Sequence, residues 1–161
     1  MLMVSFRDVD SGAVAGQKRM IIMSSLFMMD KFPTNSSIAA DGTFFSRPAV
    51  WRQIYAWHLR IKNTFVPAVV VFMGERTERA NTEMLGAISE IIRQSFGREW
   101  TVEQVMTEFE LAIRLAVRRQ FGTGVIHLSC YFYYSYCLRK KLKKLKLKKM
   151  QQGACFQSIY P

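Results

Sequence analysis

The amino-acid sequence predicts an α/β fold, in which a mixed sheet starts with three antiparallel strands, continues in strand–helix units and carries helices on its faces. Three strand-like runs lie close together within residues 38–73, a spacing typical of a meander. After Gly74 the apolar period alternates between that of helices and that of strands, so the predicted order is β-β-β-α-β-α-β-α. With 161 residues, of which 50% are hydrophobic, the chain suits one domain with a real core.

The three strands of the meander differ in the burial that their patterns predict. IAADGTFF at 38–45 follows the turn-forming run PTNSS, and Asp41 ends or interrupts this strand. From Gln53 to Ile61 polar and apolar residues alternate, which is typical of a strand with one covered face. VPAVVVFM at 66–73 is continuous and β-branched, which favours a buried central strand.

The later elements follow from changes of period. Apolar residues recur at helical spacing from Thr77 until Gly97 closes the pattern, and the alternation of strand and helix then continues. In order, we expect a helix at 77–96, a strand at 100–109, a helix at 110–121, a strand at 125–134 and a helix at 135–149.

These elements predict a central domain with two flanking segments. The domain covers 38–149, between a lead-in at 1–37, whose first seventeen residues are expected to be poorly ordered, and a tail at 150–161. The apolar run at 20–29 has about half the length of a membrane span, so we expect a core segment and no membrane partner. Three cysteines without a CxxC pair favour neither a disulfide framework nor a cysteine zinc site, and fit a reducing intracellular compartment.

The positive charge is concentrated in one run near the C-terminus. The net charge is +11, but RKKLKKLKLKK at 139–149 holds eight of the 23 basic residues, and without it 15 basic residues face 12 acidic ones. As a helix, the run shows a narrow leucine stripe on a basic cylinder, which can contact DNA phosphates, act as a nuclear localisation patch, bind an acidic membrane or calmodulin-like partner, or simply be solvated. The candidate nucleic-acid contacts are Arg139, Lys140, Lys141, Lys143, Lys144, Lys146, Lys148 and Lys149.

Two carboxylates, Asp41 and Glu108, are expected at the ends of neighbouring strands. Such a pair repels itself unless a cation lies between the two groups, and Mg²⁺ or Mn²⁺ prefers oxygen ligands of this kind. The pattern equally allows structural roles: Asp41 in an Asp-Gly turn, and Glu108 and Glu110 as negative charge at the start of a helix. His58 and His127 lie in apolar strands without ligand spacing, and we expect both to be structural.

Several motifs in this order resemble the transposase domain of Mutator-like elements, the MULE domain. They are DGTF followed by a short polar stretch and Pro48, the segment Gln53-Ile54-Tyr55, Val66-Pro67, the threonine-rich start of the long helix, and the TEFELA block. The resemblance covers about residues 38–145. It implies an RNase H-like fold and a DDE-type transposase, in which three acids hold divalent metal for cleavage and transfer of DNA strands.

The resemblance assigns roles to site residues, and the sequence also departs from the family pattern at several of these positions. Asp41 matches the first acid, Glu108 stands where the family has its second Asp, and Glu110 matches a Glu that is not catalytic. The third acid is expected in a helix well downstream, beyond Pro161. The family's Cys and His pair is also incomplete, because Tyr133 stands three residues after Cys130 in the place of the His.

We therefore expect a truncated and degenerate transposase-derived domain that is inactive as isolated. If it is active, its cofactor is Mg²⁺ or Mn²⁺, held by Asp41 and Glu108. Its expected partner is DNA, with copies of the chain assembling in a transposition complex, and its expected location is the nucleus, otherwise the cytoplasm. The alternative is a non-catalytic DNA-binding remnant or repurposed module that uses the basic helix at 139–149.

Overall fold

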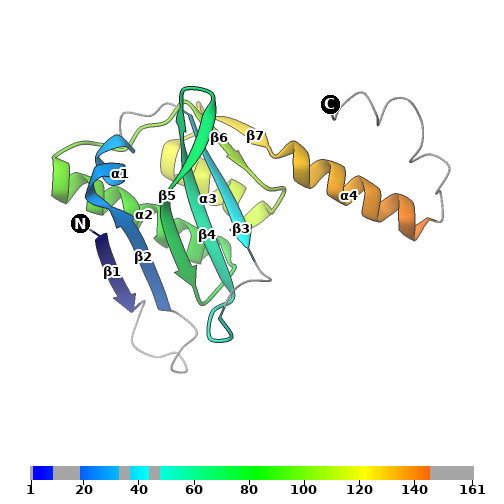
Figure 1. The fold of residues 1–161 in the computed structure, drawn as a ribbon, viewed down its shortest axis with the longest axis horizontal. Coiled ribbons are helices and arrows are strands. Elements are labelled where there is room, and N and C mark those ends of the chain that lie inside the picture. Colours follow the sequence, from blue (N-terminus) through cyan, green and yellow to red (C-terminus); the bar gives the residue numbers. More distant parts are fainter. Residues whose placement is uncertain (1, 9–18, 33–36, 44–47, 146–161) are drawn as a thin grey trace. The chain divides into compact units, whose positions relative to one another are not determined.

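The computed structural model describes residues 2–8, 19–32, 37–43 and 48–145, and its strands form one mixed sheet (Figure 1). The sheet has seven strands in the order β1-β2-β5-β4-β3-β6-β7. β1 with β2, β2 with β5, β5 with β4 and β4 with β3 pair antiparallel, whereas β3 pairs with β6 in parallel. The elements are β1 (Leu2–Asp8), β2 (Arg19–Ser25), α1 (Leu26–Lys31), β3 (Ser37–Thr43), β4 (Gln53–Ile61), β5 (Thr64–Met73), α2 (Glu78–Phe96), β6 (Gln104–Thr107), α3 (Leu111–Phe121), β7 (Ile126–Ser129) and α4 (Tyr131–Lys144).

The predicted fold class is confirmed. From β3 onward the elements follow the predicted order, and the mixed sheet with its flanking helices is compatible with an RNase H-like fold. One predicted strand is wrong in part, because Tyr131–Tyr134 belong to α4 and β7 ends at Ser129. Aromatic residues favour strands only where a sheet surface receives them, and here the rings of Tyr131 and Tyr134 lie one helical turn apart, 6.1 Å between centroids.

The predicted lead-in at 1–37 needs correction, because it contributes to the sheet. β2 pairs with β5 from Met20 opposite Met73 to Ser24 opposite Val69, and β1 pairs with β2. The run at 20–29 is a core segment as predicted, since Met20 and Met29 are buried. The chain divides into two compact units, Met1–Leu128 and Ser129–Pro161. The predicted tail at 150–161 lies outside the described residues.

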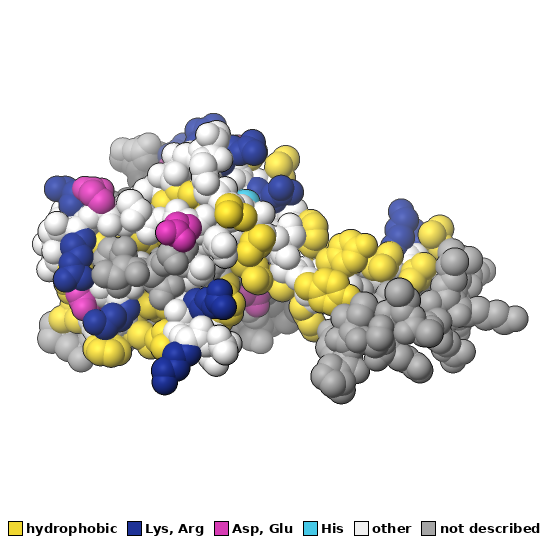
Figure 2. All heavy atoms as spheres, turned by 90° about the horizontal axis from the view of Figure 1, so that it is seen from above, with side chains coloured by type: hydrophobic (Ala, Val, Ile, Leu, Met, Phe, Trp, Pro, Cys, Tyr) yellow, Lys and Arg dark blue, Asp and Glu magenta, His cyan; other side chains and the backbone are white. Residues whose placement is uncertain are grey.

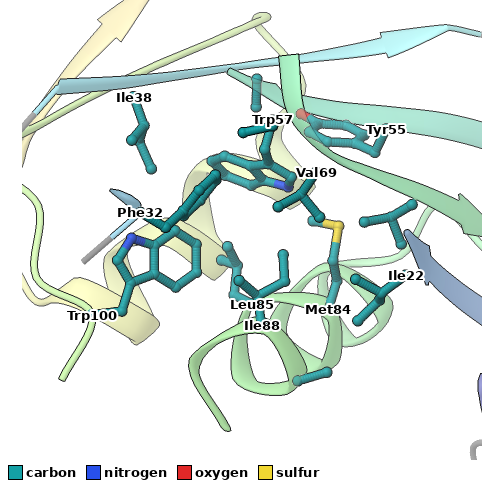
Figure 3. Close-up of a cluster of buried hydrophobic side chains, with 14 of the residues drawn as sticks. Ile22, Phe32, Ile38, Tyr55, Trp57, Val69, Met84, Leu85, Ile88 and Trp100 are labelled. Carbon is teal, nitrogen blue, oxygen red and sulfur yellow. The ribbon is translucent and has the colours of Figure 1, made fainter. Parts of the chain in front are cut away.

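Local signals explain where α2 begins and ends. The Thr77 hydroxyl accepts a hydrogen bond from the Ala80 amide at 3.2 Å, which caps the first turn. The helix ends at Gly97, whose φ of 63° is the left-handed conformation that glycine adopts without steric cost. Within these limits α2 places one apolar face against the sheet, and Met84, Leu85 and Ile88 are fully buried (Figure 3).

The core of the first unit is centred on aromatic side chains that lie between the sheet and α2. Trp57 of β4 meets the edge of Trp100, whose ring centroid is 6.0 Å away, and Trp100 also contacts Phe32 at 5.1 Å (Figure 3). Burial alternates along β4, with Tyr55 and Trp57 on the covered face. This alternation turns Asp41 of the neighbouring strand, on the opposite face, towards solvent.

The buried aromatic cluster is expected to contribute strongly to the stability of the fold. Truncation of the fully buried Trp57, as Trp57→Ala, is expected to lower the free energy of unfolding by about 3–5 kcal/mol, because it removes apolar area and leaves a cavity. Trp51→Ala is the matched control, since this indole is only half-buried and packs on Phe72 at the sheet surface. Urea unfolding followed by circular dichroism measures both, and equal losses would contradict the placement of the core.

Candidate acidic site at the ends of β3 and β6

The register between β3 and β6 brings the two predicted acids together. Ser37 pairs with Gln104 and Ala39 with Met106, an offset of 67 positions. Asp41 and Glu108 each lie two residues beyond this last pair, and the charge of Asp41 raises the pKa of Glu108, so the two carboxylates lie near one another. Their surroundings differ, because Asp41 is exposed whereas Glu108 is buried beside the backbone of Gly42.

Glu108 is held by the backbone of the neighbouring strand. β6 ends at Thr107 whereas β3 continues to Thr43, so a β3 amide beyond the end of β6 needs another acceptor. The Gly42 amide donates to Glu108 Oε2 at 3.0 Å, and the carboxylate therefore takes the place that a strand carbonyl would have. The side chain is only 5% exposed, and Glu108 Oε1 has no hydrogen-bond partner among the described residues.

The surroundings of Glu108 favour its protonated form. Burial raises its pKa from 4.5 to about 7, although the hydrogen bond from the Gly42 amide acts in the opposite direction. The charges of Asp41 and Glu110 raise the pKa further, and Arg76 lowers it. Near neutral pH this carboxyl is consequently divided between its ionised and protonated forms.

Tyr55 is a further polar group of this site, and the sequence interpretation missed it. Its hydroxyl is buried and faces the Glu108 carboxylate, outside ideal hydrogen-bond geometry but close enough for this contact to contribute to its raised pKa. Burial raises the pKa of Tyr55 well above its usual value, and the charge of Glu108 adds to the effect, which places the two groups close together. The sequence points to Tyr55 as part of the Gln53-Ile54-Tyr55 motif and of the alternating strand, and to no polar role for its hydroxyl. Tyr55 is recognised as part of the site because it pairs with Gly42, the residue whose amide binds Glu108. This pairing depends on the register of β3 with β4.

Glu110 has the position that was expected of it. It is the N-cap residue of α3, and its carboxylate lies 3.4 Å from a guanidinium nitrogen of Arg76. No hydrogen bond joins its side chain to the first turn of the helix, so its contribution there is electrostatic. Since Arg76 partly neutralises Glu110, the acids of this region are not equivalent.

The chemistry of the acid pair suits a divalent cation, but two protein ligands do not fill the coordination shell of such an ion. Asp41 is exposed and Glu108 has one oxygen without a partner, and both offer the hard oxygen ligands that Mg²⁺ and Mn²⁺ prefer. A cation beside them would also offset their repulsion. Across the described part of the chain, however, no group of three or more His, Cys, Asp or Glu side chains could hold a metal ion. These residues suit one weakly held ion with water in most of its shell.

Known proteins give no independent identification. No family model and no curated protein matches the chain.

The two histidines have different surroundings. His127 Nε2 lies 2.6 Å from the Thr107 hydroxyl, which also donates to the Glu108 carbonyl at 3.0 Å. The proton of the ring is therefore best placed on Nε2, as the donor to Thr107. His58 is half-buried in β4. The hydrogen bond of His127 is the kind of structural interaction that the sequence predicted.

The basic run is helical at least to Lys144, as α4. Its described cations are all exposed, and the helix begins with aromatic side chains that are also largely exposed, Tyr131, Phe132 and Tyr134 (Figure 2). None of the described helices is long and apolar enough to cross a membrane. The exposed cations are Arg139, Lys140, Lys141, Lys143 and Lys144, whereas Lys146, Lys148 and Lys149 lie outside the described residues.

The raised pKa of Glu108 predicts how stability depends on pH. Between pH 4.5 and about 7 the folded state holds a proton that the unfolded state has released, so the free energy of unfolding falls as pH rises through this range. Glu108→Gln removes this titration and keeps an acceptor for the Gly42 amide. We expect the variant to match the wild type near pH 4.5 and to exceed it by about 2 kcal/mol at pH 8.

Denaturant unfolding across this pH range measures the difference. Glu90→Gln is the control, because the carboxylate of Glu90 pairs with Arg93 at 2.7 Å on the surface of α2. A difference between Glu108→Gln and the wild type that does not change with pH would contradict the assignment of the proton to Glu108.

Proposed function

We propose that this chain is a domain derived from a DDE-type transposase of the Mutator-like kind, in which the acid pair binds a divalent cation weakly and does not cleave DNA. The observation that carries the proposal is the parallel pairing of β3 with β6, beyond which Asp41 lies near enough to Glu108 for its charge to raise the pKa of that carboxyl. The resemblance of DGTF and TEFELA to the MULE domain places the first two acids at these same positions. The closeness of the two acids and the resemblance of the motifs are independent arguments for one pair of residues.

The residues that would hold the cation are Asp41, from the solvent side, and Glu108, through Oε1. A cation bound there supplies charge neutralisation at phosphate oxygens and a more acidic bound water. Asp41 is the exposed ligand and can also orient a water molecule. Glu108 is the buried one, and its Oε2 is already engaged by the Gly42 amide.

Three properties of Glu108 argue against strand cleavage by this site. Its side chain has one methylene more than Asp, which moves the carboxylate by roughly 1.5 Å. Mg²⁺ requires near-ideal geometry, and a displacement of about 1 Å can reduce a rate by on the order of 100-fold. The hydrogen bond to Gly42 and the pKa of about 7 further commit this carboxyl to the fold and to a proton.

Cation binding is tested directly with Mn²⁺. At pH 8, above the pKa of Glu108, titration followed by the electron paramagnetic resonance of free Mn²⁺ should show one weak site. Asp41→Asn and Glu108→Gln should each weaken it about tenfold, because each removes one charged ligand. Glu90→Gln should leave it unchanged. Equal affinity in all four proteins would show that the acid pair is not the ligand.

A nicking assay on supercoiled plasmid at pH 8, with Mg²⁺ or Mn²⁺, tests whether the protein cleaves DNA. We expect no nicking above the level of the Asp41→Ala variant, even at high protein concentration. Nicking by the wild type that Asp41→Ala abolishes would overturn the inactive assignment and support a working strand-transfer site.

The second candidate function is DNA binding by α4, which the exposure of its five described cations favours. Lysine and arginine side chains on a helix bind phosphates without reading sequence, and each neutralised phosphate releases a counterion. This function requires no metal and agrees with the expected nuclear location.

A salt titration distinguishes the two functions. Duplex DNA affinity should fall linearly with salt on logarithmic axes, and replacing the five described cations of α4 by Gln should reduce the slope by up to about 4. Asp41→Ala should not change the slope, because Asp41 lies in the other compact unit. An unchanged slope in the Gln variant would exclude α4 as the DNA contact.

A further inference from the structure

A cavity of about 200 Å³ opens beside α3 and β7, and neither acid of the pair lines it. Its polar lining comes from two guanidiniums, one hydroxyl and one imidazole, and apolar side chains complete the wall. The cavity is smaller than the roughly 300–1,000 Å³ of pockets that hold drug-sized ligands, so it suits one small group. The lining residues that matter here are Arg114, Arg118, Thr123, Val125, His127 and Leu115.

The two arginines form an uncompensated positive pair. Arg114 and Arg118 lie four residues apart on α3, so their side chains share one face of the helix. Among the described residues neither makes an ion pair, whereas Arg119, the next residue along, pairs with Glu78 at 2.8 Å. Like charges at this spacing repel, and an anion between them would offset the repulsion.

His127 gives the cavity a third polar wall whose orientation is determined. Its Nε2 donates to the Thr107 hydroxyl at 2.6 Å, which holds the ring at the edge of the cavity. Burial lowers the pKa of His127, and the charges of Arg114 and Arg118 lower it further, so both guanidiniums act on this ring. The ring, the two cations and the cavity thus belong to one local environment.

We propose that this cavity binds a single phosphate group, either free phosphate or the phosphate of an ester. Guanidiniums bind phosphate oxygens through paired hydrogen bonds, and two of them match a group with two charges better than a carboxylate with one. The Thr123 hydroxyl can donate to a third oxygen, and Leu115 and Val125 offer an apolar wall for the organic part of an ester. The inference is independent of the proposed transposase ancestry, because it uses neither Asp41 nor α4.

The test uses the two histidines of the chain as internal probes. Inorganic phosphate is titrated into the full-length protein at constant ionic strength, and the imidazole proton resonances are followed by NMR. The His127 signal is expected to shift and saturate, while the signal of His58, which does not line the cavity, stays in place. Acetate at the same concentrations should produce a much smaller shift.

A pair of variants with the same change in net charge separates a site from general attraction. Arg114→Gln/Arg118→Gln is expected to weaken phosphate binding about tenfold or more. Arg93→Gln/Arg119→Gln removes two arginines that do not line the cavity, and less than a twofold change is expected. Equal losses in the two variants, parallel shifts of both histidines or a shift that does not saturate would each overturn the proposal. Circular dichroism verifies that both variants are folded.

Oligonucleotides then identify the source of the phosphate. A short single strand with a 5′-phosphate is compared with the same strand ending in a 5′-hydroxyl, using the His127 signal. A shift with the phosphorylated strand alone assigns the cavity to a terminal phosphate, and equal shifts assign it to the diester backbone. No shift with either strand, together with saturation by inorganic phosphate, assigns it to a small phosphate-bearing molecule.

Discussion

β3 and β6 pair in parallel, but β6 ends first. The positions of the polar groups in the acidic site result from this difference in length. β6 stops at Thr107, so the Gly42 amide of β3 has no strand carbonyl beside it, and the Glu108 side chain accepts its hydrogen bond instead. This bond draws the carboxylate into the interior, where burial raises its pKa to about 7. The same bond brings Glu108 near the buried Tyr55 hydroxyl on the next strand.

Under the proposed transposase ancestry Glu108 stands in the place of an Asp, and its longer side chain would have two opposite effects on this site. The additional methylene moves the carboxylate away from the position that a metal shared with Asp41 would require. It also gives the side chain enough length to turn back to the Gly42 amide, which Asp would reach less easily. The fold thus gains a partner for a buried backbone amide at the position where catalysis would need a free, ionised ligand. Stability and strand cleavage make incompatible demands on residue 108.

Sequence periodicity predicted the parts of the fold whose signals are local. The alternation in β4 and the helical spacing of α2 each reflect burial on one face, and both were identified correctly. The failures depend on distant partners: β2 joins the sheet through β5, and Tyr131–Tyr134 are helical although their composition favours a strand. In the site, Asp41 and Glu108 were found through their place at strand ends. The role of Tyr55 was not, because it follows from the register of β3 with β4.

The cavity beside α3 could not be predicted at all, because no spacing in the sequence relates Arg118 to His127 without the turn between α3 and β7. That short strand is held to β6 by the Ile126 amide, which donates to the Glu103 carbonyl at 2.9 Å, and by the hydrogen bond between Thr107 and His127. Thr107 therefore lies between the two candidate sites: its hydroxyl supports the ring that borders the cationic cavity and donates to the carbonyl of the buried acid. The backbone of Glu108 and the ring of His127 are consequently joined by one buried hydroxyl, so we expect a change at Thr107 to alter both sites together, whereas changes at Asp41 or Arg114 would alter only one.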